Sequence, residues 1–369
     1  MNQQPNARHV PAAVQQRQLR LENTRAQEQL DFVADLLRQP LDTRAHYMSS
    51  TYKNILDELD TASDQQINVP GAPLAAVESQ RPENKPLNRY SNVYPFDKNR
   101  VVVGDNGYIN ASAIAVPLSS QATRDPAYIA AQGPLAHTVA DFWRMIHQHS
   151  TDLIICLTKD QENGRRKYNP YFAPSQHFPF LSTTPKTRNS PSTLPTAMLG
   201  AFRKHVEVGE RYRNHPGAPL AVTQIANVVL RKFEVKVVQG PGQDVVENSK
   251  RDVWQIDCLG WPDHGALAVD ELLAVVELAR FVSPSVRRPW VVHCSAGCGR
   301  TGTLIAVDFI TRYLESGIRA PYFGDHNDLV AATVTDLRSQ RVLMVQTLVQ
   351  FELVYAAVAR YMELMGYIA

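Results

Sequence analysis

One stretch of the chain decides how the rest can fold: Val291-Val292-His293-Cys294-Ser295-Ala296-Gly297-Cys298-Gly299-Arg300-Thr301-Gly302. Just before it, residues 289–292 are apolar and rich in bulky β-formers, which predicts a buried strand. After it, the apolar run 301–314 predicts a helix that ends at Gly317. The turn between them is built of small residues. Its backbone amides and the helix dipole together predict a cradle for an anion.

This cradle would act on a sulfur and on a phosphate at once. A thiolate at a helix N-terminus beside a fixed cation is favoured over the thiol, so the pKa of Cys294 should be low. Arg300 offers a planar fork for two phosphate oxygens, which lysine cannot match. Gly297 and Gly299 leave room for the bound group, and Thr301 places a hydroxyl beside the sulfur. These residues predict phosphoryl transfer to cysteine, followed by hydrolysis.

The stretch from His293 to Gly302 resembles the extended Cys-x5-Arg signature of protein tyrosine phosphatases. Other motifs of that family follow one another in the same order: Asn88-Arg89-Tyr90, Tyr108-Ile109-Asn110-Ala111, Gln132-Gly133-Pro134, Phe142-Trp143 and Trp261-Pro262-Asp263. The resemblance covers residues 87–362 and implies an α/β fold. We therefore expect a single protein tyrosine phosphatase-like domain, with a twisted mixed sheet flanked by helices.

The resemblance also implies a role for individual residues. Cys294 would attack phosphorus, Asp263 would donate a proton to the leaving oxygen, and Gln346 would place the water of the second step. The implied catalytic residues are Cys294, Arg300, Asp263, Thr301 and Gln346. The implied substrate-binding residues are Tyr90, Asn92, Ser295, Ala296, Gly297, Cys298, Gly299 and Gln350, and the implied supporting residues are His293, Glu162 and Lys167. This chemistry requires no metal and no cofactor.

Composition limits the class of protein. The chain has 369 residues and a net charge of +2, which gives no reason to expect a nucleic-acid partner. No apolar run approaches the roughly 18 residues that a membrane span needs, and no secretory signal is recognised. The four cysteines fit a reducing compartment, which a catalytic thiolate also needs. We therefore expect a cytoplasmic protein without a membrane span.

The chain pattern predicts four regions. Residues 1–24 read as a disordered tail, 25–60 as an N-terminal helical cap, 61–86 as a linker or loop, and 87–362 as the catalytic domain. A segment at 173–205, rich in Pro, Ser and Thr, reads as an insertion. The two Pro-rich segments resemble those of fungal phosphatases of the phosphotyrosine-specific, non-receptor type. That likeness implies tyrosine-phosphorylated proteins as partners, with a mitogen-activated protein kinase as a candidate substrate.

Other interpretations stay open. A metal site at His293, Cys294 and Cys298 is disfavoured, because no second Cys/His pair follows at zinc spacing. Two alternative functions are a dual-specificity phosphatase and a non-catalytic phosphotyrosine-binding module. The motif residues argue against both, and assays on phosphothreonine and phosphoinositides would separate the first. His264 stands where family members usually have phenylalanine, so its effect on closure of the acid loop is open.

Overall fold

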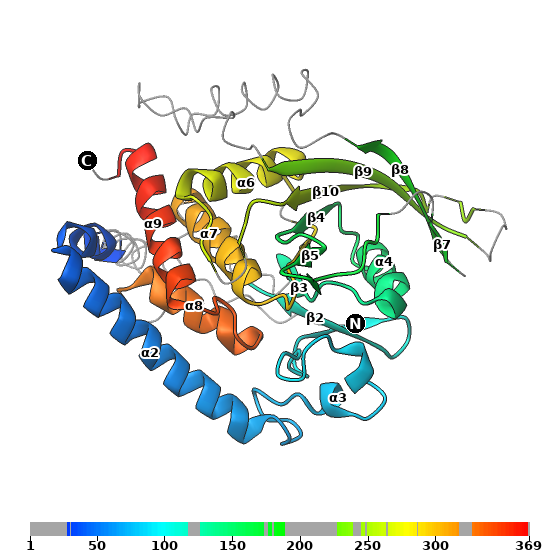
Figure 1. The fold of residues 1–369 in the computed structure, drawn as a ribbon, viewed down its shortest axis with the longest axis horizontal. Coiled ribbons are helices and arrows are strands. Elements are labelled where there is room, and N and C mark those ends of the chain that lie inside the picture. The colour runs from blue at the N-terminus through cyan, green and yellow to red at the C-terminus, as the bar shows by residue number, and fades with distance from the viewer. Residues whose placement is uncertain are drawn as a thin grey trace, which may run out of the picture.

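The computed structural model describes residues 28–29, 31–116, 126–172, 176–178, 181–188, 227–238, 245–247, 249–262, 265–285, 287–316 and 327–367. Within these ranges the chain forms a nine-stranded sheet with helices on both faces (Figure 1). The strand order is β1-β2-β3-β11-β4-β10-β9-β8-β7. The predicted tail and the residues Asp263 and His264 lie outside the described ranges.

The strands are β1 (Arg100–Val103), β2 (Gly107–Ile114), β3 (Tyr128–Ala131), β4 (Leu153–Cys156), β5 (Gln161–Glu162), β6 (Arg165–Arg166), β7 (Gln176–Phe178), β8 (Leu181–Arg188), β9 (Val228–Val237), β10 (Arg251–Cys258) and β11 (Trp290–His293). The helices are α2 (Leu41–Gln66), α3 (Val77–Gln80), α4 (Val139–Gln148), α6 (Val269–Val282), α7 (Gly299–Ser316), α8 (Leu329–Gln340) and α9 (Leu348–Leu364), with 3-10 turns η1 (Lys85–Leu87) and η2 (Ala136–Thr138). Residues 31–38 are also helical.

The predicted mixed sheet is confirmed. Its centre is parallel, because β11 pairs with β3 and with β4, and β4 pairs with β10, all in the same direction. The outer pairs β1–β2, β2–β3 and β9–β10 are antiparallel. All four residues of β11 are buried, as expected of a parallel strand covered on both faces. The signature stretch therefore begins at the C-terminal end of a central strand, where α/β folds place ligands.

Helices cover the two faces of the sheet unequally. On one face α4 packs its Phe142, Trp143 and Ile146 against the strands. On the other face lie α6, α7, α8 and α9 (Figure 1). The middle of α7, residues 304–310, is fully buried on every side and is apolar except for Asp308, which pairs with Arg280 and Arg312. Each large apolar side chain among them contributes about 1.5–3 kcal/mol on burial, so α7 is anchored firmly behind the signature loop.

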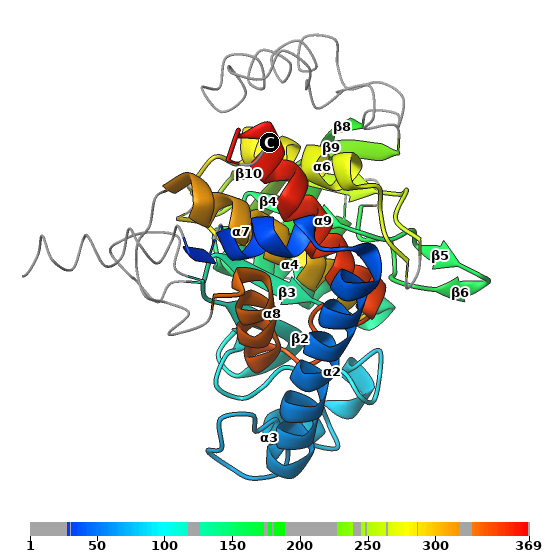
Figure 2. The same ribbon diagram turned by 90° about the vertical axis from the view of Figure 1, so that its left-hand side faces the viewer.

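The N-terminal region packs on this helical face more extensively than its composition predicts. Helix α2 runs to Gln66, crosses α8 and α9, and ends near α3 (Figure 2). The interval predicted as a linker, 61–86, thus begins inside a helix, and Leu74, Ala75 and Ala76 within it are buried. Small residues such as alanine suit both a loop and a close-packed contact, so composition alone favoured the loop. Within the predicted insertion, β8 extends the sheet beside β9.

Candidate active site

Cys294 directly follows β11, and its loop wraps around the sulfur. The backbone N–H of Gly297 donates to Cys294 Sγ at 3.3 Å. Gly297 has a φ of +71°, and a Cβ there would lie 2.1 Å from the carbonyl oxygen of Ala131 on β3. No other residue fits this position, because both the left-handed backbone and the close approach exclude a side chain. The loop is therefore compressed against the sheet, with its amides facing the sulfur.

Cys294 differs electrostatically from the other three cysteines. Burial disfavours its thiolate, but the charge of Arg300, the Thr301 hydroxyl and nearby backbone amides outweigh burial, so the pKa of Cys294 lies below its usual value. Burial raises the pKa of Cys298 to about 11 and that of Cys258 to about 12, and it raises the pKa of Cys156 as well. Among the four, Cys294 is therefore the cysteine whose thiol ionises most readily.

Arg300 is oriented by a carboxylate. Its NH1 and NH2 donate to Oε1 and Oε2 of Glu162 at 2.9 and 3.0 Å. NH1 also lies 3.1 Å from the carbonyl oxygen of Leu157 and 3.2 Å from that of Trp261. Glu162 comes from the β5–β6 hairpin, whose Asn163-Gly164 turn has positive φ at both residues, as Asn-Gly hairpin turns require. The local sequence thus explains how this charged turn reaches the signature arginine.

A cavity of about 210 Å³ opens above Cys294. Its lining brings together most of the side chains that the resemblance implied: Tyr90, Asn92, Lys167, Cys294, Ser295, Ala296, Gly299, Arg300, Gln346 and Gln350. The Cys298 side chain does not line it, because that thiol packs into a small apolar cluster with Phe96 and Val342. Thr301 and His293 lie beneath the loop and are fully buried. Asp263 falls outside the described residues.

One wall of the cavity is Tyr90. Its hydroxyl lies 2.8 Å from Ser295 Oγ, which in turn donates to the carbonyl oxygen of Lys167 at 3.1 Å. The wall is fixed from behind by the neighbouring residue Arg89. The backbone N–H of Arg89 donates to Gln132 Oε1 at 2.8 Å, and its guanidinium donates to the carbonyl oxygens of Gly133 and Pro134. The Asn-Arg-Tyr and Gln-Gly-Pro motifs therefore interlock.

Arg341 is a site residue that no motif or spacing in the sequence singles out. It is fully buried, and its Nε and NH2 donate to the carbonyl oxygens of Gly297 and Ala296 at 2.8 and 2.9 Å. Its NH2 also donates to Asn110 Oδ1 at 2.7 Å, and its NH1 donates to Ser112 Oγ at 3.1 Å, both on β2. Arg341 thus ties the outward carbonyls of the loop to the sheet. Only a long-range contact identifies it, since 44 and 45 positions separate it from Gly297 and Ala296 in sequence.

The N-terminal helix also reaches the site. The Tyr52 hydroxyl on α2 donates to the carbonyl oxygen of Val345 at 3.0 Å, directly before Gln346. Val345 has a φ of +55°, an uncommon conformation for a β-branched residue. Gln350 Oε1 accepts from the N–H of Gln346 at 2.9 Å. The turn that carries Gln346 is therefore held in a strained shape from two sides.

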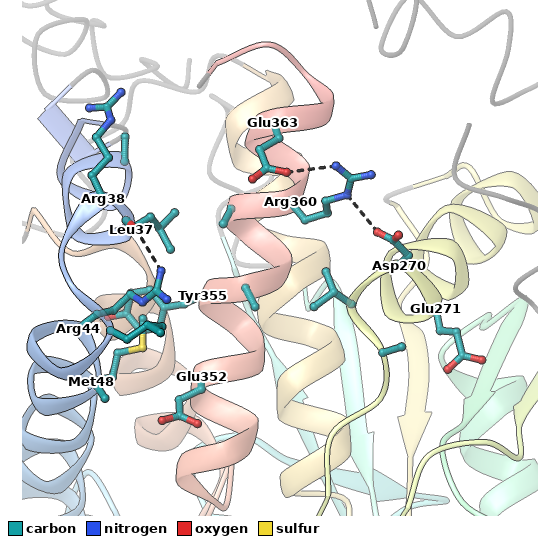
Figure 3. Close-up of a pocket in the computed structure, with 17 residues that line it drawn as sticks. Leu37, Arg38, Arg44, Met48, Asp270, Glu271, Glu352, Tyr355, Arg360 and Glu363 are labelled. Atoms are coloured by element: carbon teal, nitrogen blue, oxygen red, sulfur yellow. Dashed lines mark hydrogen bonds and ion pairs between the residues drawn. The ribbon is translucent and has the colours of Figure 1, made fainter. Parts of the chain in front are cut away.

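A larger cavity lies elsewhere. It measures about 1160 Å³ and lies between residues 34–48, α6 and α9. Figure 3 shows Arg360 at its edge, paired with Asp270 and with Glu363. It shares no lining residue with the cavity above Cys294. The larger cavity is therefore separate from the cavity above Cys294.

Known proteins provide an independent comparison. The family model described as "Protein-tyrosine phosphatase" matches residues 84–195 and 218–360. The predicted insertion at 173–205 overlaps the matched range up to residue 195. Among curated proteins, tyrosine-protein phosphatase non-receptor type 18 of Homo sapiens is 31% identical over 293 residues, which cover 78% of this chain and 53% of that protein. The chain thus spans about half the length of this relative and of its Mus musculus counterpart.

Solved structures similar to this chain are also those of protein tyrosine phosphatases. PTPN18 in complex with HER2 phosphopeptides superimposes with a TM-score of 0.65 and 27% identity, covering 88% of this chain and 97% of that one. The catalytic domain of human protein tyrosine phosphatase non-receptor type 18 gives a TM-score of 0.63 and 28% identity, covering 86% and 97%. Among the described residues no helix is long and apolar enough to cross a membrane. No group of three or more His, Cys, Asp or Glu side chains in those ranges could hold a metal ion.

Proposed function

The chain belongs to the protein tyrosine phosphatase family, and on that premise we propose that it hydrolyses phosphotyrosine in proteins through a cysteinyl-phosphate intermediate. One observation carries this proposal. The sulfur of Cys294, whose pKa is lowered, lies in a loop of inward amides beside a guanidinium that Glu162 holds in a fixed orientation. An anion with three equatorial oxygens matches such a site.

In the first step Cys294 attacks phosphorus, and the bond between phosphorus and the tyrosyl oxygen breaks. Arg300 and the loop amides stabilise the charge that develops on the equatorial oxygens. Asp263 donates the proton that the leaving oxygen takes up. Support for this acid comes from its neighbours, since the carbonyl oxygen of Trp261 accepts from Arg300 and the Trp261 indole donates to the carbonyl oxygen of Gly265 at 3.0 Å.

In the second step water attacks the phosphorus of the intermediate, and the P–S bond breaks. Gln346 positions this water, with Gln350 as its neighbour, and Asp263 accepts the proton. The Thr301 hydroxyl is buried with no other partner among the described residues, so it can donate to the departing thiolate, and its proximity helps lower the pKa of Cys294. Product phosphate then leaves from the cavity that Lys167 and Tyr90 line.

The depth of the cavity above Cys294 would make the site specific for phosphotyrosine. Tyr90 forms a wall above the sulfur, so a short phosphoserine or phosphothreonine side chain would leave its phosphate out of reach of Cys294. Asn92 lies at the same opening, where its amide can bond the backbone of a bound peptide. Tyrosine-phosphorylated proteins are therefore the proposed partners, and the structures of PTPN18 with HER2 phosphopeptides support this class of ligand.

We also propose a resemblance to fungal members of the family and a mitogen-activated protein kinase as substrate. Both rest on the two Pro-rich segments, 61–86 and 173–205. A cytoplasmic location is supported by four free cysteines, one of which must stay reduced to react. The matched relatives include the non-receptor type, which agrees with this placement.

The decisive experiment is hydrolysis of p-nitrophenyl phosphate and of a phosphotyrosine peptide in the presence of EDTA. Wild type should turn over both, and Cys294→Ser should turn over neither. Cys258→Ser is the matched control, because Cys258 is buried at the end of β10, does not line the cavity above Cys294, and has a thiol whose pKa is raised by burial. Residual turnover by Cys294→Ser would contradict the nucleophile. Equal rates on phosphothreonine would favour the dual-specificity class, and binding without turnover by wild type would favour the non-catalytic module.

A further inference from the structure

A row of polar side chains crosses four neighbouring strands directly beneath the Cys294 loop. Arg231 on β9 lies opposite Gln255 on β10, and two residues further along β10 Asp257 lies opposite Cys156 on β4, which itself lies opposite His293 on β11. None of these residues is more than 6% exposed. Burial of so many polar groups is costly unless each one is bonded, so the pattern calls for an explanation.

Four of them form a continuous chain of contacts with Tyr171. Arg231 NH1 donates to Asp257 Oδ2 at 2.9 Å and to Gln255 Oε1 at 3.3 Å. Gln255 Nε2 donates to the Tyr171 hydroxyl oxygen at 2.9 Å. The same hydroxyl lies 2.7 Å from His293 Nε2. The other ring nitrogen, His293 Nδ1, lies 3.1 Å from the carbonyl oxygen of Cys294.

The direction of every bond in this chain follows from what each group can do. Arginine has no acceptor, so the Gln255 amide must turn its oxygen toward Arg231 and its NH2 toward Tyr171. The Tyr171 oxygen accepts from Gln255, and within the described residues the group in reach that can accept its own hydrogen is His293 Nε2. That nitrogen must be unprotonated, which places the ring proton on Nδ1.

The resulting tautomer matters to the loop. With its proton on Nδ1, His293 donates to the carbonyl oxygen of Cys294 and fixes the first peptide of the loop. With the proton on Nε2, two acceptors would face each other at this 3.1 Å contact, and the peptide would have to turn. Asp257 is also part of this hydrogen-bonded chain, through its ion pair with Arg231. It supplies the charge that allows the Arg231 guanidinium, stacked 4.1 Å from the Phe172 ring, to stay buried.

We propose that Gln255, held by the Arg231–Asp257 ion pair, fixes the proton of His293 on Nδ1 and thereby positions the Cys294 loop. Gln255, Arg231 and Asp257 are positioning residues, because they act only through Tyr171 and His293. The inference rests on the proposed function only for its effect on turnover. The position of the ring proton is a property of the folded protein whether or not the protein is an enzyme.

The first test is the tautomer itself, read from the two ring-nitrogen shifts in long-range ¹H–¹⁵N correlation spectra of histidine-labelled wild type. The His293 ring is assigned through its contact with Phe142, whose ring centroid is 5.7 Å away. A proton on Nδ1 is expected. A spectrum with the proton on Nε2 would overturn the proposal without any variant.

The second test compares two substitutions of similar size at one position. In Gln255→Glu the carboxylate accepts from both Arg231 and Tyr171, so the Tyr171 oxygen becomes an acceptor and His293 Nε2 should gain a proton. In Gln255→Met no described group donates to the Tyr171 oxygen, so residue 255 no longer holds the ring proton and both tautomers of His293 should be populated. We expect kcat of Gln255→Glu to fall about tenfold or more with KM changed less than about twofold, and kcat of Gln255→Met to fall less.

The control is Asp252→Asn, which breaks the more exposed 2.8 Å pair with Lys232 on the same two strands. It should leave both the tautomer and kcat unchanged. The proposal fails if Gln255→Glu leaves Nε2 unprotonated, or if Gln255→Glu and Gln255→Met lower kcat equally. An inactive wild type with its proton on Nδ1 would contradict the proposed function and leave the positioning role supported.

Discussion

Glu162 and Arg300 form a bidentate ion pair, with both carboxylate oxygens within 3.0 Å of guanidinium nitrogens. The pair lies at the floor of the cavity, where Arg300 is 3% exposed and the Glu162 side chain 10%. The guanidinium is therefore oriented before a substrate arrives. Preorganised charge is more effective than charge that must be ordered during the reaction, because no reorganisation is needed at the transition state.

Arg300→Lys should show how much this fork contributes. Lysine keeps the charge but cannot bond Glu162 and two phosphate oxygens in one plane. We expect kcat/KM for p-nitrophenyl phosphate to fall about 100-fold or more, and vanadate to inhibit more weakly. Arg166→Lys is the control, since Arg166 forms an exposed pair with Asp160 at 3.8 Å. Near-normal turnover in Arg300→Lys would contradict the assigned role.

Arg341→Met should destabilise the protein as well as slow it. The substitution keeps the stem but leaves the buried carbonyl oxygens of Ala296 and Gly297 without their donor. We expect the free energy of unfolding to fall by about 3 kcal/mol in urea titrations. Arg360→Met removes a half-exposed pair with Asp270 and should cost less than about 1 kcal/mol. Equal losses in the two variants would show that Arg341 does not hold the loop.

Tyr90 should determine which phosphorylated residue reacts. Tyr90→Phe keeps the ring and loses only the contact with Ser295 Oγ, so its preference for phosphotyrosine should persist. Tyr90→Ala removes the wall, and kcat/KM for a phosphotyrosine peptide should fall about tenfold or more while that for phosphothreonine stays low or rises. Paired steady-state assays on peptides of one sequence test this. Unchanged selectivity in Tyr90→Ala would show that the Tyr90 wall does not determine which phosphorylated residue reacts.

His293 should make stability depend on pH. Burial lowers its pKa to about 4, and the Arg89 charge adds to this. Because the unfolded ring titrates near 6.5, the unfolded chain binds the extra proton between about pH 6.5 and 4. The native state should therefore lose about 3 kcal/mol as pH falls through this window and keep it above.

Urea titrations at pH 7 and pH 4 measure this loss. The drop in unfolding free energy should be about 3 kcal/mol smaller in His293→Gln than in wild type. His46→Gln, at an exposed position on α2, should follow wild type. Identical drops in wild type and His293→Gln would show that the ring does not titrate in this window.

Asp263→Ala should separate binding from turnover and identify partners. Removing the proton donor should lower kcat about 10²- to 10⁴-fold and leave KM nearly unchanged, because the lost interaction belongs to the transition state. Expressed in cells, the variant should retain tyrosine-phosphorylated proteins that vanadate elutes. A mitogen-activated protein kinase among them would support the proposed substrate. Wild-type turnover by Asp263→Ala would show that the acid is another residue.

The loop from His293 to Gly302 could be predicted from sequence alone, because its residues are covalent neighbours whose strand–turn–helix pattern is local. Gly297 illustrates this, since its φ of +71° and its contact with β3 leave no alternative to glycine. The same holds for the Asn163-Gly164 turn that presents Glu162. Local backbone conformation depends on neighbouring residue types, so a pattern can predict it.

Which distant residues meet this loop depends on how the whole chain packs. The row from Arg231 to His293 forms because β9, β10, β4 and β11 lie side by side and in register, and Arg341 and Tyr52 reach the site because α8 and α2 pack against the same domain. No spacing along the chain encodes that order. The same reason explains Cys298, whose backbone belongs to the loop while its thiol packs against Phe96 and Val342, and the buried Ala75 and Ala76 of the predicted linker. Burial and register arise from packing of the whole chain, and composition cannot supply them.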